Sequence, residues 1–300
     1  MNPDALLACV SSPACAVTQV STALIVGTLL FLVASGLSLI FGVLGVINFA
    51  HGGFYMLGAY FAFTAYKLTG SFVLALLAGS VGAGLFGIAF ERLIISRVYG
   101  RDLLMQLLVC YAMTLILDDG VKMIYGAEYL MMGMPAAFAV PPLQVFGGFI
   151  PGYYVFMVGV SLAAGLVLWL GINRTLLGKT VRALAINPQM VGVLGVNTKL
   201  LYAAVFGVGS LLAGLAGALA APIRTLTPGV GLSFLIDSFI VTVIGGMGSI
   251  AGAFIAALLI GFIRAFGAIG FPWFVDGSMF AIMVVVLVVK PTGLLGRRVA

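Results

Sequence analysis

The sequence predicts an all-α integral membrane protein, a polytopic bundle of about eight to ten transmembrane helices in one domain over residues 1–300. Hydrophobic residues make up 63% of the chain and charged residues only 7%, whereas soluble domains carry about 25% charged residues. The apolar runs are about 20 residues long, which suits helices that cross a bilayer and is too long for the alternating strands of a barrel. Glycines interrupt several of these runs, which predicts broken helices.

The apolar runs place the individual spans along the chain. We expect spans near residues 17–40, 45–66, 72–90, 103–124, 150–171, 200–221, 232–246, 250–267 and 273–289. The segment 36–60 is also compatible with a re-entrant piece, and 232–267 with one broken hairpin. The first twelve residues lack the basic start of a secretory signal, so we expect the first apolar run to stay as a spanning helix.

The basic residues gather in connectors and set the orientation of the chain. They form three clusters: Arg92, Arg97 and Arg101; Arg174, Lys179, Arg182 and Lys199; and Lys290, Arg297 and Arg298. We place all three in the cytoplasm, with the N-terminus and the region 118–128 outside. The net charge of +6 therefore reflects membrane topology. We expect contact with lipid and no binding of nucleic acid.

The segment 36–60 is the first interrupted run, and it carries polar groups at depth. Asn48 and His51, the only histidine, lie in its middle and are followed by Gly52 and Gly53. Backbone leaves helical geometry inside a membrane only where protein or a water-filled cavity satisfies it. These four residues are therefore candidates for a substrate pathway. The alternative is that Asn48 and His51 bond to neighbouring helices and pin a sharp bend.

A second interrupted run lies at 236–260 and contains Gly245, Gly246, Gly248 and Ser249. Paired interrupted segments in the two halves of a transporter point to its pathway. Small residues at this spacing also let helices approach closely, so a packing role is equally compatible. Asp237 is the best candidate for an ionisable group within a span, although we favour an interfacial place near the end of a helix.

The connector 174–199 is the longest one on the predicted cytoplasmic side. Its residues 179–186 can form a short helix, and Asn187-Pro188 is typical of a helix cap followed by a first turn. Gly195 is positioned to end the second helix. The sequence thus predicts a short amphipathic pair of helices, whose apolar residues suit either a groove on a partner or the lipid surface.

The chain shows no pattern for catalysis, nucleotide binding or a metal site. Gly178-Lys179-Thr180 ends like a phosphate-binding loop, but Asn173 stands where the first glycine should be. One histidine cannot build a metal cluster with distant cysteines. Cys9 and Cys15 could pair in a periplasm or be small apolar residues at a mobile terminus, and we favour the second reading. We expect no catalytic residue, metal or cofactor on this chain.

Several motifs together resemble one transporter family. GVLGVINFAHGGFYMLGAY at 42–60 resembles the signature of permease subunits of branched-chain amino acid ABC transporters. GKTVRALAINPQMVGVLGVNT at 178–198 resembles the coupling segment of that family. VIGGMGSIAGAFIAALLIG at 243–261 and KPTGLLGR at 290–297 also match its pattern. The resemblance extends from about residue 20 to the end of the chain.

The resemblance implies a set of partners and a location. It implies a second homologous permease, two cytoplasmic ATP-binding subunits that carry ATP and Mg, and a periplasmic binding protein, all at the bacterial inner membrane. The two interrupted runs would meet near the middle of the bilayer. Docking on an ATPase would involve these residues of the coupling segment: Arg182, Ala185, Asn187, Pro188, Val191, Leu194 and Gly195.

The substrate and the energy source stay open at the level of sequence. Relatives of this family resemble carriers of branched-chain and other amino acids, amides, urea and organic acids. Gly53 stands where many relatives are expected to have an acidic residue, which puts a standard amino-acid substrate in question. An ion-coupled secondary transporter using His51 or Asp237 is the alternative, with a channel or scaffold as a further one. The docking segment at 178–198 argues against both.

Overall fold

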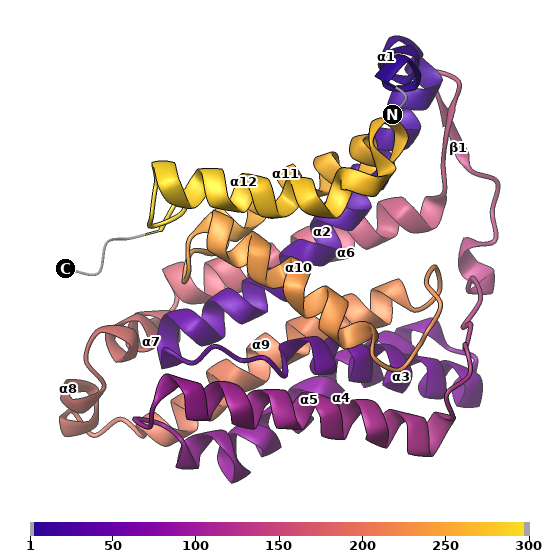
Figure 1. Cartoon of the computed structure of the whole chain (residues 1–300). Helices are drawn as coiled ribbons and strands as arrows, with labels where there is room; N and C mark the ends of the chain where they lie inside the picture. Colours follow the sequence, from indigo (N-terminus) through magenta and orange to yellow (C-terminus); the bar gives the residue numbers. More distant parts are fainter. Residues whose placement is uncertain (1–2, 297–300) are drawn as a thin grey trace.

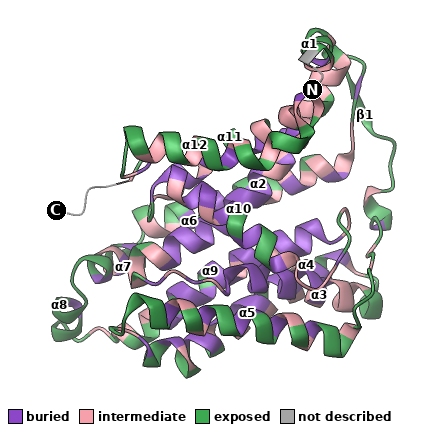
Figure 2. Cartoon of the chain, viewed as in Figure 1, coloured by how far each residue is buried: buried purple, intermediate pink, exposed green. Residues whose placement is uncertain are grey.

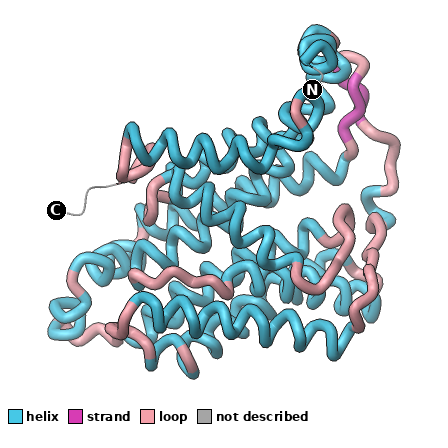
Figure 3. The backbone as a smooth tube through the Cα atoms, in the orientation of Figure 1, coloured by secondary structure: helices cyan, strands magenta, loops and turns pink. Residues whose placement is uncertain are grey.

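The computed structural model describes residues 3–296, and within them long helices run roughly side by side (Figure 1; Figure 3). The α-helices are α1 Pro3–Ser11, α2 Pro13–Leu44, α3 His51–Thr69, α4 Phe72–Leu93, α5 Leu103–Tyr125, α6 Gly152–Arg174, α7 Leu176–Ile186, α8 Pro188–Val193, α9 Thr198–Ala220, α10 Val230–Gly245, α11 Ile250–Gly270 and α12 Val275–Val289. Short 3-10 helices cover Ile95–Arg97, Ala136–Phe138 and Pro272–Phe274. Strands β1 Leu143–Val145 and β2 Gly148–Ile150 complete the described elements.

The predicted polytopic helical bundle is confirmed. Each of the nine predicted spans corresponds to one helix, namely α2 to α6 and α9 to α12. Six helical segments of the described chain are long and apolar enough to cross a membrane: α2, α4 with the 3-10 helix that follows it (Phe72–Arg97), α6, α9, α11, and α12 with the 3-10 helix that precedes it (Pro272–Val289). Helix α10 is apolar but only 16 residues long. The total number of crossings stays a prediction.

Two helices form the centre of the bundle, and others present apolar surface outward. Half of the residues of α2 and most residues of α9 are buried, whereas α12 is largely exposed (Figure 2). A helix that is apolar all round is stable where it is enclosed by protein or by lipid. The exposed apolar side chains of α5, α6 and α12 therefore face lipid or another membrane chain.

Helices α3, α4 and α9 pack with their backbones almost in contact. Gly58 of α3 lies against Gly214 of α9, and Gly79 of α4 lies against the carbonyl of Gly58. A Cβ atom added at Gly79 would lie 2.5 Å from that carbonyl oxygen. Small residues at such crossings let membrane helices approach closely and gain packing contacts. The small residues of α9 around Gly214 therefore form a packing surface for α3 and α4.

The connector between α5 and α6 contains a β-hairpin that the sequence did not predict. Strands β1 and β2 pair antiparallel, with Leu143 opposite Ile150. Phe146 and Gly147 form the turn with φ angles of 49° and 80°, as two-residue hairpin turns require. Such turns are usually marked by Asn-Gly or Asp-Gly, so the phenylalanine hid this one.

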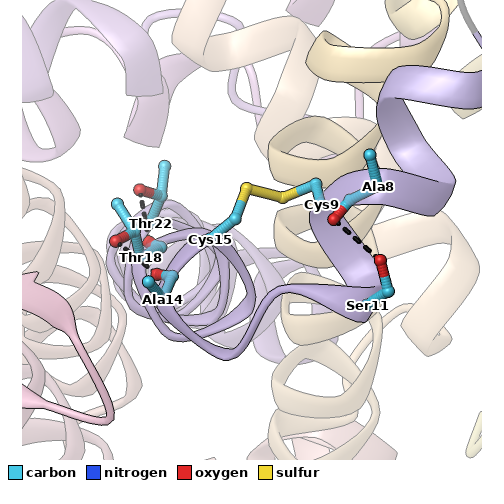
Figure 4. Close-up of a disulfide and its surroundings, with 7 residues drawn as sticks. All are labelled: Ala8, Cys9, Ser11, Ala14, Cys15, Thr18 and Thr22. Carbon is cyan, nitrogen blue, oxygen red and sulfur yellow. Dashed lines mark hydrogen bonds between the residues drawn. A yellow bond between two sulfur atoms is a disulfide. The ribbon is translucent and has the colours of Figure 1, made fainter.

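Cys9 and Cys15 form a disulfide, so the expectation that they stay unpaired at a mobile terminus is wrong (Figure 4). Helix α1 ends at Ser11 and α2 begins at Pro13, and this break turns the chain so that the two cysteines face each other with Cα atoms 5.1 Å apart. Helix α1 also packs on α11. Helix α1 is therefore tied to the bundle.

Thiol labelling of intact cells tests both this bridge and the predicted orientation. We expect the wild-type chain to react with a membrane-impermeant maleimide only after reduction, because Cys110, the remaining cysteine, is buried. Cys9→Ser frees Cys15 and should react without reduction. Labelling of the wild type before reduction would contradict the bridge. Labelling that needs permeabilised cells would contradict an outside N-terminus.

Candidate functional site

The chain between α2 and α3 is extended, so the run at 36–60 is interrupted as predicted. Helix α2 ends at Leu44, and Gly45 takes a left-handed conformation (φ 68°) whose N–H donates to the carbonyl of Phe41 at 2.9 Å. In the described part of the chain, Val46 and Ile47 make no backbone hydrogen bond. Free backbone groups at membrane depth are tolerated only beside protein or a cavity. This break is therefore the first candidate for a pathway.

Asn48 and His51 are both fully buried at this break. The Oδ1 atom of Asn48 accepts the N–H of Ala50 at 3.0 Å, and Nε2 of His51 lies 3.0 Å from the carbonyl of Val33. A carbonyl can only accept, so Nε2 carries the proton and Nδ1 is left as an acceptor. Asn48 Nδ2 and His51 Nδ1 have no partner in the structure. Each side chain thus stabilises the bend through one hydrogen-bonding atom, and its second polar atom has no partner.

Gly52 and Gly53 let two other helices approach the start of α3. A Cβ atom at Gly52 would overlap the backbone of Gly231 on α10. At Gly53 it would lie 2.7 Å from Cδ1 of Leu117 on α5. Leu117 fills the space that a carboxylate at position 53 would need. This contact is a physical reason for glycine at a position where an acidic residue was expected.

The second interrupted run also breaks as predicted, between the end of α10 at Gly245 and the start of α11 at Ile250. Gly246 and Gly248 have φ angles of 99° and 86°, and Ser249 Oγ caps α11 by accepting the N–H of Gly252 at 3.0 Å. Gly248 approaches Gly42 near the end of α2. The same loop receives the C-terminal turn, since the N–H of Leu295 donates to the carbonyl of Gly245 at 3.0 Å.

The two interrupted runs touch through Gly42 and Gly248, but Gly52 does not lie beside the glycines of the second break. The element that faces Gly52 is the start of α10, at Gly231. At ~1.5 Å per residue, the helix places Gly245 about 20 Å further along its axis. Gly245, Gly246, Gly248 and Ser249 thus lie at the opposite end of α10 from the His51 break.

A cavity of about 240 Å³ lies beside the break. Its lining comes from α2, the extended segment, α10 and α12: Leu37, Ile47, Asn48, Phe49, Leu235, Ile236, Phe239, Ile240, Phe280 and Met283. Asn48 is the polar side chain among them. The sequence predicted a site at Asn48 but not the lining residues from α10 and α12, because no sequence pattern links those helices to residue 48.

The connector 174–199 has the helical geometry that its sequence predicts. Asn187 caps α8 by accepting the N–H of Met190 at 3.0 Å, Pro188 occupies the first turn, and Gly195 follows the helix with a φ of 83°. Helices α7 and α8 expose a run of apolar side chains at one end of the bundle: Leu176, Leu177, Ile186, Met190, Val193 and Leu194. An apolar surface of this kind is suited to a partner groove.

The predicted docking residues divide into exposed and anchoring groups. Ala185, Asn187, Pro188, Leu194 and Gly195 are exposed. Val191 is the buried residue of α8, and Arg182 donates to the carbonyl of Ile172 and to Asn173 Oδ1 at the end of α6. Arg182 and Val191 therefore hold the segment in place, and a partner would meet the exposed group.

Comparison with known proteins decides the family. A family described as the permease component of branched-chain amino acid transport systems matches residues 19–287. The chain belongs to this family. The high-affinity branched-chain amino acid transport system permease protein BraD of Pseudomonas aeruginosa is 32% identical over 292 residues, covering 93% of this chain and 95% of that protein. LivH of Escherichia coli, of the same description, is 30% identical over 296 residues with the same coverage.

One relative that matches only part of the chain is named for a different substrate. The fructose import permease protein FrcC of Rhizobium meliloti is 36% identical over 129 residues, which is 40% of this chain and 36% of that protein. The chain is thus a multi-pass membrane permease, and its relatives are transport components. The family alone leaves its substrate open.

The permease also contains a charge pair that sequence reasoning did not find. Asp237 of α10, which is buried, pairs with Arg264 of α11 at 2.8 Å, and Asp276 of α12 lies 3.4 Å from the same guanidinium. Asp237 is thus a paired residue that packs inside the bundle, and its interfacial place in the membrane stays a prediction. The sequence did offer a signal for this pair: Asp237 and Arg264 are opposite charges in two consecutive apolar spans, and ions buried in a membrane pair with one another.

Removing Arg264 is expected to destabilise the permease strongly. Arg264→Leu leaves the Asp237 carboxylate buried and unpaired, which costs about 3–5 kcal/mol of unfolding free energy. Asp276→Asn is the matched control, with an expected loss below about 1 kcal/mol because the Asp276 side chain is 82% exposed. Thermal unfolding of the purified variants measures both. Equal losses would show that the Asp237 pair has no special weight.

Tyr99, in the loop between α4 and α5, links α4 to α9 at the end of the bundle near α8. Its hydroxyl donates to Glu91 Oε1 at 2.8 Å, and its ring lies 5.3 Å from that of Tyr202 on α9. Burial, and then the bond to Glu91, raise the pKa of Tyr99 above its usual value, so it stays a neutral donor. The ends of α4 and α9 are therefore joined here.

Proposed function

We propose that this chain is the transmembrane permease subunit of an ATP-driven importer for branched-chain amino acids in a bacterial inner membrane. The observation that carries the proposal is the exposed apolar face of α7 and α8. An exposed run of apolar side chains calls for a partner, and an ATP-binding subunit with a groove is the partner that fits a permease. The printed descriptions of BraD and LivH support the substrate class.

The proposed assembly contains several other chains. Two cytoplasmic ATP-binding subunits would carry ATP and Mg, and a periplasmic protein would deliver the substrate. A second, homologous permease would cover part of the apolar surface that α5 and α12 expose, with lipid covering the rest. No nucleotide site on this chain is needed in such an assembly.

The contacts of the coupling segment suggest how movement would reach the pathway. Arg182 ties α7 to the end of α6, and Asn197 caps α9 directly after α8 by accepting the N–H of Leu200 at 3.1 Å. Helix α9 packs on α3, which begins at the His51 break. A shift of the docked segment would therefore be passed through α9 to the break. Packed interfaces of this kind switch between discrete states.

Reconstitution in proteoliposomes tests the proposal. The permease is purified with its genomic neighbours, and uptake of radiolabelled leucine is measured with and without ATP and binding protein. We expect uptake that needs both and that persists when an ionophore collapses ion gradients. Uptake that survives without ATP and stops with the ionophore would favour an ion-coupled secondary transporter instead.

A further inference from the structure

Helix α12 contacts α10 and α11 on one side and is otherwise largely exposed (Figure 2). The apolar cavity lies where α10 and α12 face each other, and the charge cluster of Asp237, Arg264 and Asp276 adjoins it. We infer that this crevice binds one phosphatidylethanolamine molecule of the membrane, with an acyl chain in the cavity, the phosphate on Arg264 and the ammonium group on Asp276. The inference does not depend on the proposed ATP-driven import.

The cavity suits a hydrocarbon chain. No polar atom reaches its surface, and Nδ2 of Asn48, although unpartnered, is enclosed by protein. An apolar cavity of ~150 Å³ stays dry and binds apolar molecules, so one of about 240 Å³ has room for a run of methylene groups. Ile236 and Phe280 at its edge are 43% and 46% exposed. The cavity therefore reaches the surface of α10 and α12 that acyl chains meet in a membrane.

The charge cluster has free atoms of both signs. Nη2 of Arg264 makes both of its ion pairs, so within the described residues Nε and Nη1 of Arg264 and Oδ2 of Asp276 make no hydrogen bond. Guanidinium donors suit a phosphate, and a carboxylate oxygen accepts from a primary ammonium.

The balance of charge in the cluster selects the headgroup. Two carboxylates and one guanidinium leave a net negative charge, which disfavours an anionic headgroup such as that of phosphatidylglycerol. Phosphatidylcholine has a quaternary ammonium group with no N–H to donate to Asp276. Phosphatidylethanolamine carries a phosphate and a donating ammonium with no net charge, so it complements both sides of the cluster.

The order of charges and cavity along α12 matches the shape of a lipid. Asp276 lies in the first turn of α12, and the cavity residues Phe280 and Met283 follow further along the helix. At ~1.5 Å per residue they lie about 6 and 10 Å deeper along the axis. The end of a spanning helix lies near headgroups, and its middle lies among acyl chains. A leucine held by its charged groups at Arg264 would reach only the near edge of the cavity, whereas an acyl chain continues into it.

Quenching of a single tryptophan by brominated lipid tests the site. The substitutions Trp169→Phe and Trp273→Phe remove both native tryptophans, and Phe280→Trp then places a reporter in the cavity wall. The permease is reconstituted in phosphatidylcholine vesicles with increasing fractions of a lipid that has brominated acyl chains. We expect half-maximal quenching at a fraction of phosphatidylethanolamine at least threefold lower than that of phosphatidylglycerol.

Two controls separate the site from ordinary contact with the bilayer. Val284→Trp lies on the same helix, is 56% exposed and does not line the cavity, so its quenching should show no headgroup preference. Asp276→Asn makes the cluster neutral and removes the acceptor carboxylate, so the preference seen by Phe280→Trp should be lost in that background.

Native mass spectrometry of the wild-type chain provides a measurement that needs no reporter. After exchange into detergent with equal amounts of phosphatidylethanolamine and phosphatidylglycerol, we expect the permease to retain one molecule of the first. Met283→Trp fills the cavity and should lose this lipid, whereas Val284→Trp should keep it. Retention of neither lipid by the wild type, or equal quenching of Phe280→Trp by both headgroups, would overturn the site. Relief of the quenching by L-leucine would assign the cavity to an amino acid and also overturn the inference.

Discussion

The Gly58→Leu variant is expected to yield almost no folded permease. Gly58 packs directly on the backbone of Gly214, so even a Cβ atom would overlap main-chain atoms of α9. Backbone cannot move aside as the end of a side chain can, and overpacking a core costs about 1–3 kcal/mol or more. The added side chain would force α3 away from α9 and open the centre of the bundle.

Size-exclusion chromatography of a fluorescent fusion measures this effect. Gly159→Leu is the matched control, because Gly159 also lies within a helix, α6, but a Cβ atom there meets nothing within 4 Å. We expect the control to elute like the wild type and Gly58→Leu to be lost or aggregated. Equal yields of the two variants would contradict the close contact of α3 and α9.

The Ile186→Glu variant is expected to abolish coupled transport while the permease still folds. Ile186 is 86% exposed on the apolar face of α7 and α8, so a carboxylate there is solvated in the isolated chain. On docking, that carboxylate would be buried against the partner without a counter-charge, which is strongly unfavourable. Uptake should fall at least tenfold, which corresponds to about 1.4 kcal/mol or more of lost docking energy.

Co-purification of the ATP-binding subunit and leucine uptake check this expectation. Gln189→Glu adds the same charge to the neighbouring helix at an exposed residue that is already polar, so it should cause a smaller loss. If both variants fail equally, charge itself opposes docking. If Ile186→Glu binds its ATPase and transports normally, α7 and α8 are not the docking surface.

Sequence alone predicted the positions of the helices well, because long apolar runs have few other solutions in a membrane. The cap at Asn187 and the end at Gly195 were also predictable, since each follows from the local chemistry of the residue. Local signals did not fix the start of α3. Residues 45–50 are apolar enough for a span, yet helix begins only at His51.

Relations between distant segments were not predictable from sequence. Gly52 meets Gly231, and Asp237 meets Arg264, through contacts that depend on how α10 is set against α3 and α11. Two interrupted runs carry no information on which part of each faces the other. The cavity likewise arises only when α10 and α12 are placed beside Asn48.

The length of α2 has a consequence for the membrane in which the permease works. Its 32 residues span about 48 Å at ~1.5 Å per residue, against ~30 Å of hydrocarbon. Even a tilt of ~40°, near the upper limit for membrane helices, leaves several ångströms uncovered. The first turns, with the hydroxyls of Thr18 and Thr22 and the bridge to Cys9, must then stand among lipid headgroups and water. The helix is therefore longer than the hydrocarbon layer is thick, and a thicker membrane would enclose more of its N-terminal end.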